Sequence, residues 1–166
     1  MPSVTETDSY LIDGQPYARV TRVLELLYPV ERSREMTAAA KLGTQFHQLV
    51  AQALTVGAPA TIPDPLQTAW AAWSEWRAHH LAETGEVEQV EVEQVVFSPT
   101  LKVAGTIDFL QPHMVTDWKT SSKIREEHWW QVNAYARLAI EDRHLPITHV
   151  RIVRCRNPQV AASSCA

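Results

Sequence analysis

The sequence predicts an α/β domain in which a central mixed β-sheet is flanked by helices. Two observations lead to this fold class. After a short hairpin, the chain up to about residue 83 is dominated by segments with helical spacing of apolar residues. Residues 87–119 then hold valine-rich segments that alternate like strands, followed by one more helical segment and a last strand. This order is typical of a sheet covered by helices.

The first elements are a hairpin and a short helix. Residues 10–20 resemble two strands joined at Asp13-Gly14, a dipeptide that favours tight hairpin turns. We expect Thr21 to cap the short helix. That helix should end before Pro29, because the residue before a proline avoids helical dihedral angles.

Two longer helices are expected next. Residues 37–54 place several apolar side chains on one helical face: Leu42, Phe46, Leu49, Val50 and Ala53. Residues 57–65 form a proline-rich connection, after which Asp64 can cap a helix with Pro65 in its first turn. That helix should run to about Glu83. Its three regularly spaced tryptophans are interpreted as a buried stripe rather than a stacking surface for bases: Trp70, Trp73 and Trp76.

The second half of the chain should build most of the sheet. The predicted strands are residues 87–97, 102–110, 114–119 and 147–154, with a helix at 126–142 before the last of them. We expect residues 1–158 to form one domain and 159–166 to form a flexible C-terminal tail.

Composition restricts the classes of function. With 45% hydrophobic and 20% charged residues, the profile is that of a globular protein, and no apolar run reaches membrane-spanning length. The formal net charge of −4 argues against a protein that coats nucleic acid nonspecifically. Two cysteines and no recognisable signal peptide favour a cytoplasmic location, in a bacterial cell or a phage-infected host. The arginines near the C-terminus fit either a phosphate-facing surface or an ordinary solvated edge: Arg143, Arg151, Arg154 and Arg156.

One predicted hairpin carries candidate chemistry. If its turn sits on Pro112 and His113, Asp108 faces Asp117 across the ladder, with Cβ atoms roughly 4.5–5.5 Å apart. A divalent cation would remove the repulsion between the two carboxylates. Lys119 follows Asp117 by two residues and shares its face. A salt-bridged surface hairpin is the alternative reading of this spacing.

Four motifs in order carry a family resemblance: Gly43-Thr-Gln-Phe-His47, Gly105-Thr-Ile-Asp108, Asp117-Trp-Lys119-Thr-Ser and Gln131-Val-Asn-Ala-Tyr135. They span roughly residues 40 to 140. The chain resembles the RecB-type branch of the PD-(D/E)XK nuclease superfamily, in particular phage exonucleases and the mitochondrial genome maintenance exonuclease. This resemblance implies a restriction-endonuclease-like fold and metal-dependent hydrolysis of DNA.

The resemblance assigns a role to each matching residue. It implies Mg²⁺ or Mn²⁺ as cofactor, held by Asp108, Asp117 and the backbone carbonyl of Trp118, with His47 at or near the metal. Lys119 is implied to position the attacking water or to offset charge on the phosphate.

Two further assignments follow from the resemblance. Gln131 and Tyr135, which share a helix face, are implied to touch the active site or the DNA. Relatives often carry an acidic residue on the strand before Asp108, a place for which Glu93 fits best and Glu91 is the other candidate. The alternative is a charged outer face, because these two residues belong to an acidic run.

The expected function is therefore a DNA nuclease, and the resemblance implies an exonuclease acting at DNA ends in recombination, replication or repair. Two cysteines cannot supply four ligands, so no iron–sulfur cluster is expected. The alternatives are a structure-specific endonuclease on the same fold and a noncatalytic DNA-binding module. Protein partners are not indicated.

Overall fold

The structure of the protein is a computed structural model, which describes residues 4–6, 9–29, 33–84 and 90–156. The strands in this part of the chain are β1 (Val4–Glu6), β2 (Ser9–Ile12), β3 (Gln15–Arg19), β4 (Glu91–Ser98), β5 (Val103–Gln111), β6 (Met114–Lys119) and β7 (His149–Arg154). The helices are α1 (Val20–Leu27), α2 (Arg34–Thr55), α3 (Gln67–Thr84) and α4 (Glu126–Arg143), and a single 3₁₀ turn, η1 (Asp64–Leu66), precedes α3.

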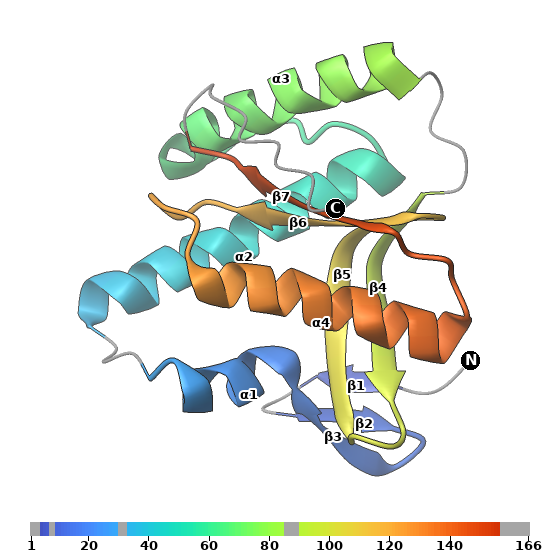
Figure 1. The fold of residues 1–166 in the computed structure, drawn as a ribbon. Coiled ribbons are helices and arrows are strands. Elements are labelled where there is room, and N and C mark those ends of the chain that lie inside the picture. The colour runs from blue at the N-terminus through green and yellow to red at the C-terminus, as the bar shows by residue number, and fades with distance from the viewer. Residues whose placement is uncertain (1–3, 7–8, 30–32, 85–89, 157–166) are drawn as a thin grey trace.

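The strands form one mixed sheet in the order β1-β2-β3-β5-β6-β7, with β4 on the other edge of β5. The pairs β3–β5 and β6–β7 are parallel, and the remaining pairs are antiparallel. Helices α1 and α4 pack on one face of the sheet, and α2 and α3 pack on the other (Figure 1). The predicted α/β class, with a mixed sheet flanked by helices, is confirmed.

Strand β5 is the centre of this arrangement. Along one edge it pairs with β4 from Val103 to Leu110. Along the other edge it pairs first with β3, through Val103 and Ala104, and then with β6, from Phe109 to Gln111. Residues 105–108 therefore lie between two ladders on that edge, where the sheet forks. The motif Gly105-Thr-Ile-Asp108 occupies this fork.

Two apolar cores hold the layers together. The first lies between the sheet and helices α1 and α4, and its members include Ile107, Leu110 and Val132. The second lies between the sheet and helices α2 and α3, and its members include Phe109 and Trp118. Both cores therefore anchor β5, because side chains of this strand point into each of them.

The hairpin at the N-terminal end agrees with the sequence. Asp13 and Gly14 form the turn between β2 and β3, and their φ angles of 50° and 74° are the positive values that such a turn requires. The cap of α1 was predicted wrongly. Arg19 stands at the N-cap, because the strand runs directly into the helix, and Thr21 lies inside it. The helix ends before Pro29 as expected.

The next helices begin differently from the predictions. Helix α2 starts three residues earlier than expected because the Ser33 hydroxyl accepts a hydrogen bond from the backbone of Met36 at 3.2 Å. Asp64 is not the cap of α3. It begins η1 with Pro65, and the Gln67 side chain donates to its carboxylate at 3.0 Å.

The tryptophan stripe of α3 is part of the core. Trp73 and Trp76 are 1% and 6% exposed, as the sequence analysis favoured, while Trp70 is partly buried against them. No helix in the described ranges is long and apolar enough to cross a membrane. Residues 87–89 of the strand predicted at 87–97, and the tail predicted to be flexible at 159–166, lie outside the described residues.

A candidate metal centre at the fork of the sheet

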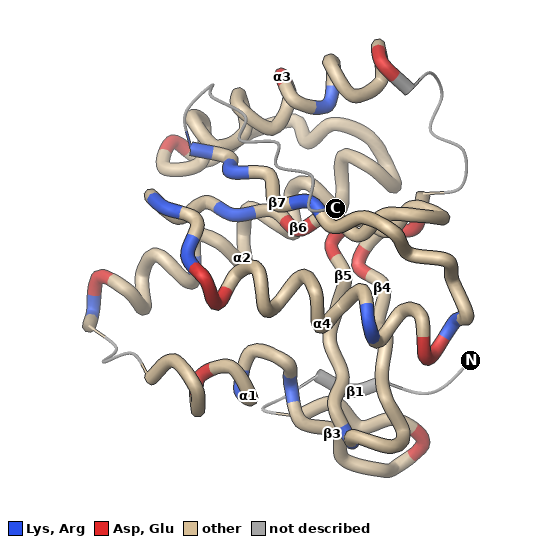
Figure 2. Tube along the Cα trace, viewed as in Figure 1, with Lys and Arg blue, Asp and Glu red and all other residues tan. Residues whose placement is uncertain are grey.

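Three acidic residues lie side by side on adjacent strands. Val92 pairs with Phe109 and Gln94 with Ile107, so Glu93 stands opposite Asp108. Phe109 also pairs with Thr116, and this register, continued by one step beyond the last pair, brings Asp108 of β5 and Asp117 of β6 to facing positions at the fork. Neighbouring acidic positions of β4 and β5 are visible at the centre of the tube in Figure 2.

Glu93 has an unusual backbone conformation. Its φ of 52° lies in the left-handed region although it stands inside β4. A residue with a Cβ atom reaches this region at a cost of roughly 1–2 kcal/mol. The kink coincides with the position opposite Asp108, so the strand is distorted where the carboxylates meet.

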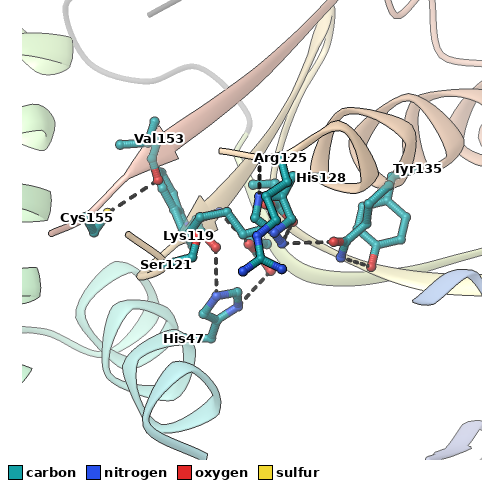
Figure 3. A network of polar contacts seen from close by, with 12 residues as sticks. His47, Lys119, Ser121, Arg125, His128, Tyr135, Val153 and Cys155 are labelled. Carbon is teal, nitrogen blue, oxygen red and sulfur yellow. Dashed lines mark hydrogen bonds and ion pairs between the residues drawn. The ribbon is translucent and has the colours of Figure 1, made fainter. Parts of the chain in front are cut away.

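His47 reaches the same place from α2. Its Nδ1 lies 3.1 Å from Oδ1 of Asp108, and its Nε2 lies 3.0 Å from the carbonyl oxygen of Trp118 (Figure 3). The other Asp108 oxygen accepts a hydrogen bond from the Trp118 backbone at 2.7 Å. At the fork, the Asp108 carboxylate therefore accepts a hydrogen bond that a backbone carbonyl would accept if the ladder between β5 and β6 continued. His47, Asp108 and Trp118 form one connected group.

Lys119 stands on the other side of the carboxylates. Its Nζ lies 3.1 Å and 2.8 Å from the two carboxylate oxygens of Asp117 and donates to Oε1 of Gln131 at 2.9 Å. The amide nitrogen of Gln131 in turn donates to the phenolic oxygen of Tyr135 at 2.7 Å. The Lys119 side chain is only 15% exposed. The residues that the resemblance grouped together are thus joined by direct contacts.

Gly105 explains the position of Tyr135. A Cβ atom on this glycine would clash with Cε1 of the Tyr135 ring and would lie 2.8 Å from Cδ1, well inside ordinary carbon contact distance. The sequence assigned no role to Gly105 itself, although a glycine inside a strand often marks a site where another group approaches the backbone closely. Gly43 differs, because a Cβ atom there would meet Thr120 Oγ1 at an ordinary 3.5 Å.

The electrostatics of the group follow from burial and pairing. Burial opposes protonation of His47, but the Asp108 carboxylate outweighs it and raises the pKa of the imidazole to about 9. In the absence of a metal ion, both ring nitrogens therefore carry protons at neutral pH and donate to their two partners, and a metal ion that bound the ring would displace one of these protons. Burial raises the pKa of Asp117 to about 6, although Lys119 acts in the opposite direction.

The donor set fits a divalent cation. One ligand atom each from His47, Glu93 and Asp108 lies within 4.8 Å of the others, and these residues could hold a metal ion. Carboxylate oxygens suit Mg²⁺ and Mn²⁺, and a ring nitrogen is also a common metal ligand. This group contains Glu93 where the sequence analysis placed Asp117, which pairs with Lys119 instead. Glu91 takes no part in it, since it pairs with Arg143 at 2.6 Å.

The C-terminal arginines are held by separate partners. Arg143 also donates to Gln94 and to a backbone carbonyl of β4, and Arg154 donates to the Ser122 carbonyl at 3.0 Å. Arg151 lies over the ring of Trp76. These contacts favour the reading of structural side chains over one shared phosphate-facing surface.

The comparisons with known proteins add no family. No protein-family model matches the chain, and a search of curated proteins finds no match. The assignment to a nuclease superfamily therefore stays a prediction, supported by four motifs and by the way the fold brings their side chains together.

Proposed function

We propose that the chain is a metal-dependent DNA nuclease with a restriction-endonuclease-like fold, acting as an exonuclease at DNA ends in recombination, replication or repair. The observation that carries the proposal is the convergence of Glu93, Asp108 and Asp117 on three adjacent strands, with Lys119 beside them. Two of these carboxylates, those of Asp108 and Asp117, are buried, and buried carboxylates gathered beside a lysine are a common sign of a functional site.

The cation would be Mg²⁺ or Mn²⁺. Glu93, Asp108 and His47 would hold it, with the Trp118 carbonyl beside them. When bound, such an ion supplies positive charge that stabilises the scissile phosphate and makes an attacking water more acidic. The four groups come from α2, β4, β5 and β6, so their mutual placement depends on the packed fold.

Lys119 is the residue that acts on the phosphate. An ammonium group has three N–H donors, and the contacts with Asp117 and Gln131 use two of them. The third can donate to a phosphate oxygen or to the attacking water. Since the side chain is mostly buried, its charge is weakly screened and stabilises the negative charge that develops during hydrolysis.

DNA would approach along the segment between β6 and α4. This segment carries the exposed basic residues Lys123 and Arg125, and the backbone N–H of Arg125 donates to the ring of His128 (Figure 3). Local positive charge of this kind attracts phosphates even when the whole chain has a negative net charge. Trp130, which is 53% exposed, lies on the first turns of α4 close by in sequence.

The test is digestion of end-labelled linear DNA and covalently closed circular DNA with Mg²⁺, Mn²⁺ or a chelator. We expect metal-dependent release of nucleotides from linear DNA and no cleavage of closed circles. Cleavage of both substrates would identify an endonuclease on the same fold. DNA binding without cleavage of either substrate would identify a noncatalytic binding module and contradict the proposal.

Substitution of Lys119 separates catalysis from binding. Lys119→Ala should lower the cleavage rate on the order of 10²–10³-fold, because it removes one charge-stabilising donor. Lys119→Arg should restore little, since a planar guanidinium does not replace a compact ammonium. DNA affinity and metal binding should persist in both variants. Lys41→Ala, at an exposed lysine on α2 outside this segment, is the matched control and should keep the rate within a few-fold. A rate for Lys119→Ala equal to the wild type would remove Lys119 from the mechanism.

A further inference from the structure

We propose that Gly105, Tyr135 and Gln131 form a positioning chain that fixes the Lys119 ammonium, and that Gln131 and Tyr135 act through this lysine rather than by holding DNA. The catalytic consequence rests on the proposed function. The geometric part concerns the placement of one side chain and can be tested without any catalysis.

The first step of the chain is the contact between Lys119 and Gln131. A lysine side chain has four rotatable bonds and loses much conformational entropy when it is fixed. Asp117 alone, two residues away on the same strand, offers the ammonium one anchor. Gln131 Oε1 supplies a second anchor from α4 at 2.9 Å, and two anchors on different elements define the direction of the remaining N–H donor.

The second step orients the amide of Gln131. An amide side chain has one acceptor end and one donor end, so it can be turned either way. The ammonium of Lys119 needs the acceptor end. The phenolic oxygen of Tyr135, 2.7 Å from Nε2, accepts a hydrogen bond from the donor end and so fixes the orientation that Lys119 requires.

The third step fixes the ring of Tyr135. The ring lies directly against the backbone of Gly105, in the fork where β5 has no neighbouring ladder on that edge. Tyr135 is 5% exposed and belongs to the core under α4. A ring buried in this way has no open face for DNA, which leaves its contact with Gln131 as the route by which it can act on the site.

The kinetic test uses Gln131→Leu, Tyr135→Phe and Gly105→Ala. A displaced Lys119 weakens transition-state stabilisation, so kcat should fall about tenfold to a hundredfold while KM for DNA stays within twofold. Gly105→Ala should act like Gln131→Leu, because the added Cβ would displace the ring of Tyr135, which holds Gln131. Asn133→Leu is the matched control on α4, since Asn133 contacts only the Trp129 carbonyl among the hydrogen bonds described, and it should leave both constants unchanged.

A second measurement does not depend on activity. In chelator, NMR of protein with ¹³C-labelled lysine should show two distinct ε-proton shifts for a fixed Lys119, assigned by their loss in Lys119→Arg. The two shifts should merge in Gln131→Leu and Gly105→Ala, and remain separate in Asn133→Leu. If the wild type cleaves no DNA, the proposed nuclease function fails, and this measurement still decides the positioning chain.

Two results would overturn the inference. One is an increase in KM with unchanged kcat in Gln131→Leu and Tyr135→Phe, which would mean that the pair holds DNA. The other is an unchanged pair of Lys119 shifts in Gln131→Leu. Should Gly105→Ala fail to fold because of the clash, Tyr135→Phe still tests the chain, because it keeps the ring and removes only the phenolic oxygen.

Discussion

At the scale of single residues, the backbone of Glu93 departs most clearly from the element around it. Three other non-glycine residues with positive φ, Asp13, Lys102 and His144, lie in turns or at a helix end, where this conformation is common. Glu93 alone among these four lies within a strand. The sequence indicated a site role for Glu93 only through the family resemblance, because periodicity carries no information about a single kinked position.

The kink at Glu93 predicts a reversed order of stability for two substitutions. Glu93→Gly and Glu93→Ala both remove the carboxylate, but only glycine also removes the Cβ atom that opposes a positive φ. Inside a strand, glycine is normally less stable than alanine by about 0.5–1 kcal/mol. Here Glu93→Gly should be the more stable of the two by about 0.5–1 kcal/mol, because relief of the left-handed conformation exceeds that loss.

Urea unfolding of both variants in chelator measures this difference. Val92→Gly and Val92→Ala, one residue earlier on β4, are the matched control and should show the normal order. If glycine were the less stable residue at position 93 too, the conformation of Glu93 would be an ordinary extended one. Both Glu93 variants should also bind the metal less tightly than the wild type.

At the scale of elements, the sequence predicted most of the strands and helices, and β6 with the same bounds. Its hairpin with β5 has the expected turn at Pro112 and His113, because alternation and turn residues are local signals. Helix starts were less predictable: Ser33 caps α2 three residues before the predicted start, and Arg19 stands at the N-cap of α1 because β3 runs directly into that helix. Strand β1 was missed, since three residues that pair only at the edge of a sheet carry little pattern.

The start of α4 predicts a pH dependence. The backbone N–H of Arg125 donates to Nδ1 of His128 at 3.2 Å, and only a neutral ring can accept this bond. Burial, followed by the charge of Lys119, lowers the pKa of His128 to about 4. Because the folded pKa lies below the unfolded value of about 6.5, the stabilisation is complete above pH 6.5 and is lost as the pH falls towards 4.

The free energy of unfolding, measured from pH 7.5 to pH 4 in chelator, checks this dependence. His128→Gln removes the titrating ring, so it should lose less stability than the wild type over the same pH window. The two proteins should differ little in their pH dependence above pH 7. Parallel curves down to pH 4 would show that the His128 ring protonates equally easily in the folded and unfolded chains.

At the scale of the whole molecule, the candidate centre depends on contacts between distant parts of the chain. His47 lies 61 residues from Asp108 and 71 from Trp118 along the sequence. Spacing could place Asp108 opposite Asp117, because one hairpin fixes both residues. It could not show that Glu93 lies with His47 and Asp108 in a group that could hold a metal ion, because this depends on the fork of the sheet and on the packing of α2.

Because the candidate ligands come together only in the folded chain, metal binding should stabilise the entire fold. A ligand that binds only the folded state, at a hundred times its Kd, stabilises by about 2.7 kcal/mol. For a chain of this size that corresponds to a rise in Tm of about 5–11 °C. Thermal unfolding with Mg²⁺ or Mn²⁺, compared with chelator, should show this rise in the wild type. Asp108→Asn should abolish it, since the amide retains an acceptor for the Trp118 backbone but lacks the charge that binds the cation.

Asp13→Asn provides the control for a general effect of losing a carboxylate. Asp13 lies in the turn between β2 and β3, and asparagine tolerates its positive φ, so this variant should keep the full metal-dependent rise in Tm. An equal rise in Asp108→Asn and the wild type would place the cation elsewhere on the protein. Loss of the rise in Asp108→Asn alone would tie the stability of the sheet and of α2 to one ion, because the ligands come from both.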